Sequence, residues 1–258
     1  MLSSAKIKLI NSLRYKKYRD RYGLFVIEGD KLVSEFLESG EPVKLLLALD
    51  KWIEKTDNKL LSSAEEIIKV SERELVKVSQ HKTPQNTLAL VSVRKYSPDK
   101  LSLSRTLSIA LDNIQDPGNL GTIIRIAAWF GIENILCSHG TVDVYNPKTV
   151  QSSMGALLYV KVSYTDLALL IPELIKGGMA VYAATLDGEP LRDIKIRDKG
   201  LLLFGNESKG ISDELLPYVN HKIIIPPFRK ALPGIDSLNV AISAAIICNE
   251  FRRDRGTN

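Results

Sequence analysis

The chain has 258 residues, of which 45% are hydrophobic and 25% charged, so extensive disorder is excluded. Its formal net charge of +5 favours a polyanionic partner, although lysine also serves solubility. Two cysteines and three isolated histidines, with no CxxC pair, argue against a disulfide framework and a metal site. The N-terminus lacks the apolar core of a signal peptide, and no apolar run is long enough to span a bilayer. We therefore expect a cytoplasmic protein without membrane contact.

The first 21 residues carry seven Lys or Arg against one acidic residue, Asp20. Their apolar positions are spaced as in a helix, which Gly23 would end. One interpretation is a solvated amphipathic helix. The other is a basic face whose Tyr15, Tyr18 and Tyr22 suit phosphates and stacked bases. The sequence leaves both open.

Strand and helix patterns alternate from about residue 24 to the strand-like run TLALVSV at 87–93. The stretch RKYSPDKLSLSR that follows is polar, contains a proline and lacks periodicity, which is typical of a linker. We therefore divide the chain into a small α/β domain at 1–95, a linker at 96–105 and a larger domain at 106–258.

The larger domain alternates between β-type and helical patterns, which predicts an α/β fold with a mostly parallel, doubly wound sheet. Such sheets bind ligands at the carboxyl ends of their strands. A long helix from about 238 to 254 closes the chain. The six predicted strands lie at 107–112, 134–138, 158–163, 180–185, 200–204 and 221–225.

The first strand of this domain ends in an unusual turn, LDNIQDPGNLGTIIR, which continues as an apolar helix. Arg125 lies within that apolar run. A guanidinium among apolar residues needs an anion or a carboxylate. Arg125 is therefore either a binder of an external anion or one half of a buried ion pair. The glycines match neither a dinucleotide fingerprint nor a P-loop.

Two further junctions follow later strands. In GLLLFGNESKGISDELL, an apolar strand ends at Gly205, a residue type that lets a ligand approach the backbone closely. In KIIIPPFRKALPGIDSLNVAISAAIICNE, a strand meets two prolines, and a connection at 227–236 leads to SLN at the start of the last helix. Ser237 is the predicted N-cap of that helix.

These three junctions resemble, in order and spacing, the motifs of the SpoU/TrmH family of RNA 2′-O-ribose methyltransferases, which belong to the SPOUT class. The N-terminal part resembles the small RNA-substrate-binding domain of longer members. The resemblance implies a trefoil knot in the parallel sheet and S-adenosyl-L-methionine as cofactor, with no metal. The connection 227–236 is longer than is usual in the family.

Carried onto this chain, the resemblance implies two overlapping sets of site residues. The set around the reaction centre is Asn119, Arg125, Glu207, Ser237 and Asn239. The set around the cofactor is Phe204, Gly205, Asn206, Glu207, Gly210, Ile225, Pro226, Leu238 and Asn239.

In the implied reaction a ribose hydroxyl attacks the sulfonium methyl group in line, so the enzyme must position both groups and remove one proton. Arg125 has two candidate roles. It could act as the base, which is energetically severe for a guanidinium. It could instead clamp the phosphate beside the target ribose, and that phosphate could accept the proton. We favour the clamp, and the sequence leaves both open.

The two-domain layout resembles members that modify large-subunit (23S) rRNA more than those that modify tRNA. The last helix has two apolar rows, so something should cover it on each side, and the resemblance implies that the second partner is another subunit, as in a homodimer. One row is Val240, Ala244, Ile247 and Phe251, and the other is Ile242 and Ile246.

The alternative functions are a tRNA 2′-O-methyltransferase, a non-catalytic RNA-binding protein that keeps the fold, and a nucleotide-dependent oxidoreductase.

Overall fold

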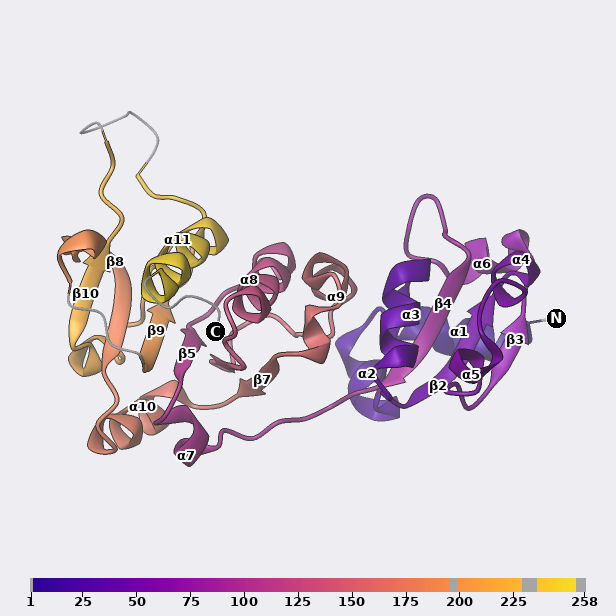
Figure 1. Cartoon of the computed structure of the whole chain (residues 1–258), viewed down its shortest axis with the longest axis horizontal. Helices are drawn as coiled ribbons and strands as arrows, with labels where there is room; N and C mark the ends of the chain where they lie inside the picture. The colour runs from indigo at the N-terminus through magenta and orange to yellow at the C-terminus, as the bar shows by residue number, and fades with distance from the viewer. Residues whose placement is uncertain (1, 195–198, 229–235, 254–258) are drawn as a thin grey trace. The chain divides into compact units, whose positions relative to one another are not determined.

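The computed structural model describes residues 2–194, 199–228 and 236–253 (Figure 1). Its contacts divide the chain into two compact units. Unit 1 holds Met1–Arg94 together with Asp143–Leu158, and unit 2 holds Lys95–Val142 and Tyr159–Asn258. A segment from the middle of the sequence thus packs with the N-terminal part. The continuous domains expected at 1–95 and 106–258 stay a prediction.

Unit 1 is built on a mixed sheet of four strands, in the order β1-β4-β2-β3. β1 and β2 both pair antiparallel with β4, while β3 runs parallel to β2. The sheet is mixed because β4 alone runs opposite to the other three strands. The strands are β1 Leu24–Glu28, β2 Val43–Ala48, β3 Ile67–Lys69 and β4 Thr87–Ser92.

Both faces of this sheet are covered, so successive strand residues enter two apolar clusters. One cluster joins α1 and α6 to the sheet, and the other joins α3 and α9 to its opposite face. The predicted N-terminal helix is two helices, and Gly23 ends the second at φ 63°. The helices are α1 Ser4–Ser12, α2 Lys16–Tyr22, α3 Asp30–Glu38, α4 Asp50–Ile53, α5 Asn58–Leu61, α6 Glu72–Val78 and α9 Pro147–Ser153, with a 3-10 turn, η1, at Ala156–Leu158.

Unit 2 is built on a sheet of six strands in the order β10-β8-β9-β5-β6-β7. Every pairing in it is parallel. The predicted fold class, an α/β chain with a parallel sheet in its larger part and a smaller α/β part before it, is confirmed. The strands are β5 Leu107–Leu111, β6 Asn134–Cys137, β7 Lys161–Tyr164, β8 Val181–Pro190, β9 Gly200–Phe204 and β10 His221–Ile224.

Helices cover both faces of this sheet. α10 packs against alternate residues of β8 and β9, among them Val181 and Leu203. The neighbouring Tyr182 points to the other face, where its ring meets Phe251 of α11 with centroids 4.9 Å apart. α11 also packs against α8 there. The helices are α7 Lys100–Leu103, α8 Pro117–Trp129, α10 Leu167–Lys176 and α11 Val240–Arg252, with 3-10 turns η2 Leu191–Asp193 and η3 Leu216–Tyr218.

β5 and β9 are neighbours in the middle of the parallel sheet, so the loops that follow them meet at one edge. The connection from β10 to α11 brings the third predicted motif. Most of that connection, residues 229–235, lies outside the described residues. The trefoil knot stays a prediction. None of the helices in the described ranges is long and apolar enough to cross a membrane.

Candidate active site

A buried carboxylate joins the loops after β5 and β9. Asp112 is 2% exposed. One of its oxygens accepts hydrogen bonds from the N–H of Ser212 at 2.8 Å and from its hydroxyl at 2.5 Å. The other oxygen accepts from Asn113 Nδ2 at 2.7 Å, and Asn206 Nδ2 donates to the carbonyl of Asn113 at 2.8 Å. Asp112 thereby holds the two motif loops in one arrangement.

The loop after β9 is tight because of its two glycines. A Cβ on Gly205 would lie 2.3 Å from the carbonyl carbon of Gly210, so only glycine fits there. Asn206 and Gly210 exchange two main-chain hydrogen bonds of 2.9 Å, and Gly210 has φ +72°. Asn206 Oδ1 accepts from the N–H groups of Ser208 and Lys209. Gly205, Asn206 and Gly210 therefore shape the loop that presents Glu207.

Three of the predicted reaction-centre residues form one hydrogen-bonded chain. Asn119 Nδ2 donates to Glu207 Oε1 at 2.7 Å, and Asn239 Nδ2 donates to Asn119 Oδ1 at 2.9 Å. Each residue comes from a different motif. The Asp116 side chain caps α8 by accepting from the Asn119 N–H at 2.9 Å. The three motifs thus converge on exposed polar atoms at the carboxyl edge of the sheet.

The expected N-cap at Ser237 is wrong. Asn239 caps α11, because its Oδ1 accepts from the N–H groups of Ala241 and Ile242 at 2.9 and 3.3 Å. This explains an asparagine at a position where a better helix former was available. Ser237 is exposed, two residues before the cap.

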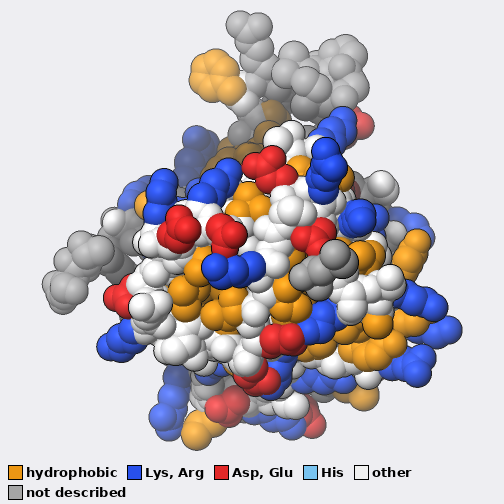
Figure 2. Space-filling view, turned by 90° about the vertical axis from the view of Figure 1, so that its right-hand side faces the viewer, with side chains coloured by type: hydrophobic (Ala, Val, Ile, Leu, Met, Phe, Trp, Pro, Cys, Tyr) orange, Lys and Arg blue, Asp and Glu red, His pale blue; other side chains and the backbone are white. Residues whose placement is uncertain are grey.

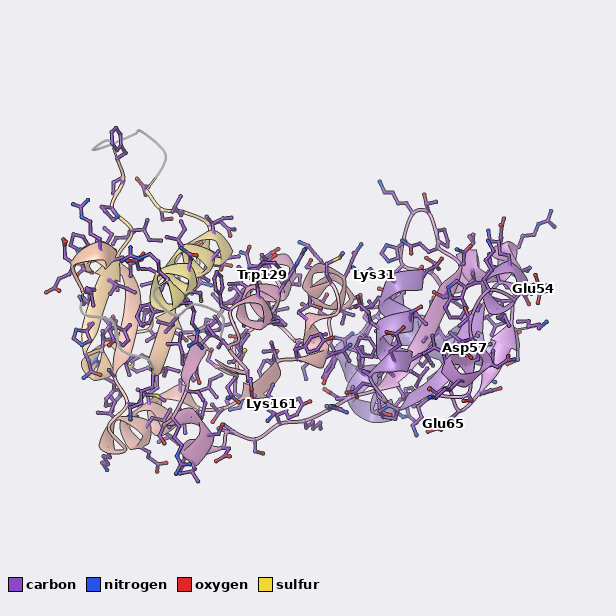
Figure 3. The ribbon with its side chains drawn as sticks, viewed as in Figure 1. Lys31, Glu54, Asp57, Glu65, Trp129 and Lys161 are labelled. Atoms are coloured by element: carbon purple, nitrogen blue, oxygen red, sulfur yellow. The ribbon has the colours of Figure 1, made fainter. Side chains whose placement is uncertain are left out.

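Arg125 is exposed, and its guanidinium makes no ion pair or hydrogen bond with any residue that the structure describes. The alternative of a buried ion pair at this position is therefore wrong. Arg125 and Asn119 are six residues apart, so they project from different sides of α8. Trp129, one turn beyond Arg125, is 84% exposed and labelled in Figure 3. Most of the apolar residues that surround Arg125 in the sequence belong to the buried face of α8.

The predicted cofactor residues offer main-chain donors beside apolar side chains. Within the described parts of the chain, the N–H groups of Gly205, Ile225 and Leu238 donate to no protein acceptor. Phe204 is buried, Ile225 is half-buried, and Pro226 and Leu238 are exposed. These groups fit a ligand that is held through backbone N–H groups and apolar contact. No cluster of His, Cys, Asp or Glu that could hold a metal occurs among the described residues.

In unit 1, the tyrosines of α2 lie among cations. The rings of Tyr18 and Tyr22 stack 6.3 Å apart, with Lys17 over the first and Arg21 over the second. Arg19, in contrast, is only 3% exposed and does not belong to this face. Figure 2, which looks onto the right-hand side of Figure 1, shows basic, acidic and hydrophobic side chains intermixed.

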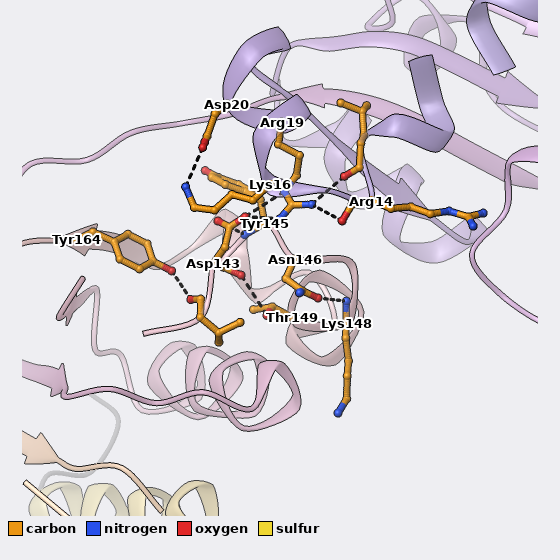
Figure 4. Close-up of polar contacts among 12 residues, drawn as sticks. Arg14, Lys16, Arg19, Asp20, Asp143, Tyr145, Asn146, Lys148, Thr149 and Tyr164 are labelled. Carbon is orange, nitrogen blue, oxygen red and sulfur yellow. Dashed lines mark hydrogen bonds and ion pairs between the residues drawn. The ribbon is translucent and has the colours of Figure 1, made fainter. Parts of the chain in front are cut away.

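Arg19 is held by partners on every side (Figure 4). Its Nε and Nη2 donate to Asp143 Oδ2 at 3.0 and 2.5 Å, and its Nη1 donates to the carbonyls of Leu13 and Arg14 at 2.8 and 2.9 Å. Nothing in the local sequence marks Arg19 as buried, since it lies among exposed Lys and Arg. The partner Asp143 lies 124 residues away.

Family models match both parts of the chain. The SpoU rRNA methylase family matches residues 106–249, and an MRM3-like substrate binding domain matches residues 4–89. The chain is 33% identical over 248 residues to the 23S rRNA (guanosine(2553)-2′-O)-methyltransferase RlmP of Bacillus subtilis, a match that covers 96% of each protein. The chain belongs to the SpoU rRNA methylase family.

Two solved structures resemble the whole methylase. One is a TrmH-family protein of Porphyromonas gingivalis, with 34% identity, a TM-score of 0.87 and coverage of 98% of this chain and 99% of that one. The other is an AdoMet-bound rRNA methyltransferase of Sinorhizobium meliloti, with 30% identity, a TM-score of 0.86 and coverage of 100% and 97%. The predicted class, an RNA 2′-O-ribose methyltransferase that uses S-adenosyl-L-methionine, is confirmed, and the oxidoreductase is set aside.

Asp112 and Ser212 are the residues of this methylase that sequence reasoning missed. Neither was among the predicted site residues, although Asp112 follows an apolar strand directly. A carboxylate at the end of a buried strand could have been recognised as a site residue in the sequence. When such a carboxylate is buried at the edge of the sheet, it needs hydrogen-bond donors from neighbouring loops.

Proposed function

We propose that this methylase transfers the methyl group of S-adenosyl-L-methionine to a ribose 2′-hydroxyl of 23S rRNA and works as a homodimer. The observation that carries the proposal is the hydrogen-bonded chain of Glu207, Asn119 and Asn239, which brings the three motifs to one edge. The preference for rRNA over tRNA is supported by the match over almost the full length to an enzyme named for 23S rRNA, front domain included.

In this proposal the cofactor lies against the loops after β9 and β10 and the start of α11. The free N–H groups of Gly205, Ile225 and Leu238 bind its polar atoms, with Phe204 and Pro226 beside it. Asn206 and Gly210 act through the shape of the loop, since the Asn206 side chain is engaged by Asn113, Ser208 and Lys209. When bound, the cofactor supplies an electrophilic methyl group.

The polar chain then orients the ribose. Glu207 accepts only one hydrogen bond in the described part of the chain, from Asn119, so its carboxylate can accept a further one from a sugar hydroxyl. Asn119 and Asn239 hold Glu207 in place, and Ser237 presents an exposed hydroxyl nearby in the chain. Positioning of this kind can account for much of the barrier reduction in a two-substrate transfer.

Arg125 is the proposed phosphate clamp. Its exposed guanidinium has five N–H donors and no protein acceptor among the described residues, which suits bidentate binding of an RNA phosphate. A guanidinium keeps its proton at neutral pH, so the phosphate that it orients would accept the proton of the ribose hydroxyl.

The homodimer is proposed from the two rows of α11. Val240, Ala244, Ile247 and Phe251 are buried within their own subunit, at 9% exposure or less. The second row, Ile242 and Ile246, remains 51% and 39% exposed, next to Leu238 at 47%. A second subunit would cover this row.

The test combines transfer, position and assembly. The full chain is incubated with labelled S-adenosyl-L-methionine and unmodified 23S rRNA, and reverse-transcription stops at low nucleotide concentration locate the methylated ribose. We expect one site, loss of transfer in Glu207→Gln, and a dimer by sedimentation that Ile242→Glu dissociates. Transfer to tRNA but not to 23S rRNA would contradict the substrate, and a stable, active monomer would contradict the dimer.

A further inference from the structure

Unit 1 contains a hollow of about 310 Å³ that the proposed chemistry does not use. It lies between β1, the loop before β4, the end of α1 and α9. Val26, Leu32 and Val150 give it an apolar wall, while Glu28, Gln80 and His81 bring polar atoms. Its volume is at the lower end of the range found for small-molecule sites.

The polar side of this hollow is firmly built. The Glu28 side chain is only 6% exposed. Its Oε1 accepts from the Ser79 hydroxyl, and its Oε2 accepts from the Gln80 N–H at 3.0 Å. His81 stands beside it, with Nε2 3.8 Å from Glu28 Oε2 and Nδ1 3.3 Å from Gln151 Nε2 of α9. The loop 79–81 is thereby held in one position.

One hydrogen-bond donor on the polar side of the hollow has no acceptor. The Nε2 of Gln80 is buried and makes no hydrogen bond with the described residues. A buried amide without a partner is costly, and such groups in folded proteins call for an explanation. A ligand with a carbonyl oxygen or a ring nitrogen would supply the acceptor.

The rim of the hollow is positively charged. Arg14 and Lys148 both line it and are exposed. Arg14 uses Nη2 to bind the carbonyl of Ser79 at 3.0 Å, which directs its guanidinium to this loop. Figure 4 shows that Arg14 and Lys148 come from chain segments far apart in sequence. Cations at the rim favour an anionic ligand group there.

We propose that this hollow binds one unpaired nucleotide of the RNA substrate. The base of this nucleotide packs against the apolar wall and the ring of His81. An acceptor atom on the edge of the base accepts a hydrogen bond from Gln80 Nε2. The phosphate of the nucleotide lies at the rim, near Arg14 and Lys148. Sequence-specific RNA recognition commonly takes this form, with splayed bases stacked on rings and hydrogen-bonded at their edges. The inference rests on the proposed RNA substrate and locates a specificity site in unit 1.

The variant Gln80→Leu removes the free donor at nearly constant volume. We expect the KM for 23S rRNA to rise about tenfold, as for the loss of one hydrogen bond, with kcat at saturating RNA unchanged. The melting temperature should not fall, because the variant loses no protein hydrogen bond from Nε2. Lys148→Gln should also raise KM, whereas Lys59→Gln, which removes the same charge elsewhere in unit 1, should not.

A second measurement identifies contact directly. Photocrosslinking of the full chain to a pool of 4-thiouridine-containing oligoribonucleotides, followed by mass spectrometry, should attach RNA to the peptides that carry His81 or Gln151. Crosslinks confined to α2, together with a wild-type KM in Gln80→Leu, would overturn the inference while rRNA methylation by the wild type still stood. Crosslinks in the hollow of a chain that transfers no methyl group would support the hollow and contradict the proposed function.

Discussion

Two arginines in this protein have opposite environments. Arg19 of unit 1 is 3% exposed, and its guanidinium donates to Asp143 and to two carbonyl oxygens. Arg125 of unit 2 is exposed and has no partner among the residues that the structure describes. The sequence suggests the reverse, because Arg19 lies in a basic stretch and Arg125 in an apolar one.

The difference separates two functions of the same side chain. The N–H donors of Arg19 are engaged within the protein. Replacing Arg19 would therefore leave Asp143 without its cation and two carbonyl oxygens without their hydrogen-bond donor. Arg125 has no partner among the described residues, so its guanidinium is free to bind a group from outside its own fold. Arginine is suited to both tasks because its planar group makes several fixed hydrogen bonds.

The largest effect is expected at Arg125. Arg125→Lys should lower methyl transfer about 10²–10³-fold, because an ammonium group cannot reproduce the bidentate contact with a phosphate. Cofactor binding by calorimetry and the melting temperature should stay at wild-type values, since the residue is exposed. Arg105→Lys, at another exposed arginine of unit 2, is the matched control. Full activity in Arg125→Lys would show that this arginine does no chemistry.

Arg19 should show the opposite result. Arg19→Met removes one half of a buried pair and should lower the free energy of unfolding by about 3–5 kcal/mol, measured with urea. The double variant Arg19→Met/Asp143→Leu should recover part of this loss, because no buried charge is left unpaired. Cofactor binding by the folded single variant should be unchanged. A single variant as stable as the wild type would mean that the pair contributes no net stability.

The exposed cations of α2 decide whether its basic face binds RNA. The triple variant Lys16→Gln/Lys17→Gln/Arg21→Gln should bind 23S rRNA about tenfold more weakly. The slope of its log affinity against log salt concentration should fall by an amount equivalent to up to about two phosphate contacts. Arg19 is left in place because it is structural. The control replaces Lys51, Lys55 and Lys59 by Gln in the same unit. If both triples keep the wild-type salt slope, the face is only a solvated surface.

The smallest effect concerns Glu74 of α6, whose carboxylate accepts hydrogen bonds from the N–H groups of Ser71 and Leu2 and from the Ser71 hydroxyl. These bonds lower the pKa of Glu74 to about 2, from 4.5. Because the folded pKa is depressed, the stability that it contributes is present above 4.5 and is lost as the pH falls towards about 2. Melting curves of Glu74→Gln should therefore depend less on pH across that window. An unchanged pH profile would rule out this contribution.

The strands of unit 2 illustrate what could be predicted without the structure. Five of the six predicted runs agree with the observed strands to within about three residues at each end, and among them the 158–163 run begins later, as β7 at Lys161–Tyr164. β8 extends beyond its predicted end, to Pro190. Parallel strands buried on both faces read as short apolar runs, which makes them recognisable in sequence.

Less of the site than of the fold could be predicted from the sequence. The motif pattern indicated Asn119, Glu207 and Asn239, and the structure links them. Their roles in the reaction stay predictions. The cap at Asn239, in place of Ser237, depends on where α11 begins, and the same Asn239 side chain also donates to Asn119, 120 positions away.

The local features of this protein could be predicted without its structure: apolar strands, glycine-bearing turns at their ends, and the order of the three motifs. These follow from backbone preferences and periodicity over a few residues. The burial of Arg19, the exposure of Arg125 and the packing of residues 143–158 with the N-terminal unit depend on the tertiary structure. Burial depends on which distant segments cover a side chain. Asp143, 124 residues from Arg19, is such a partner, and no local pattern encodes it.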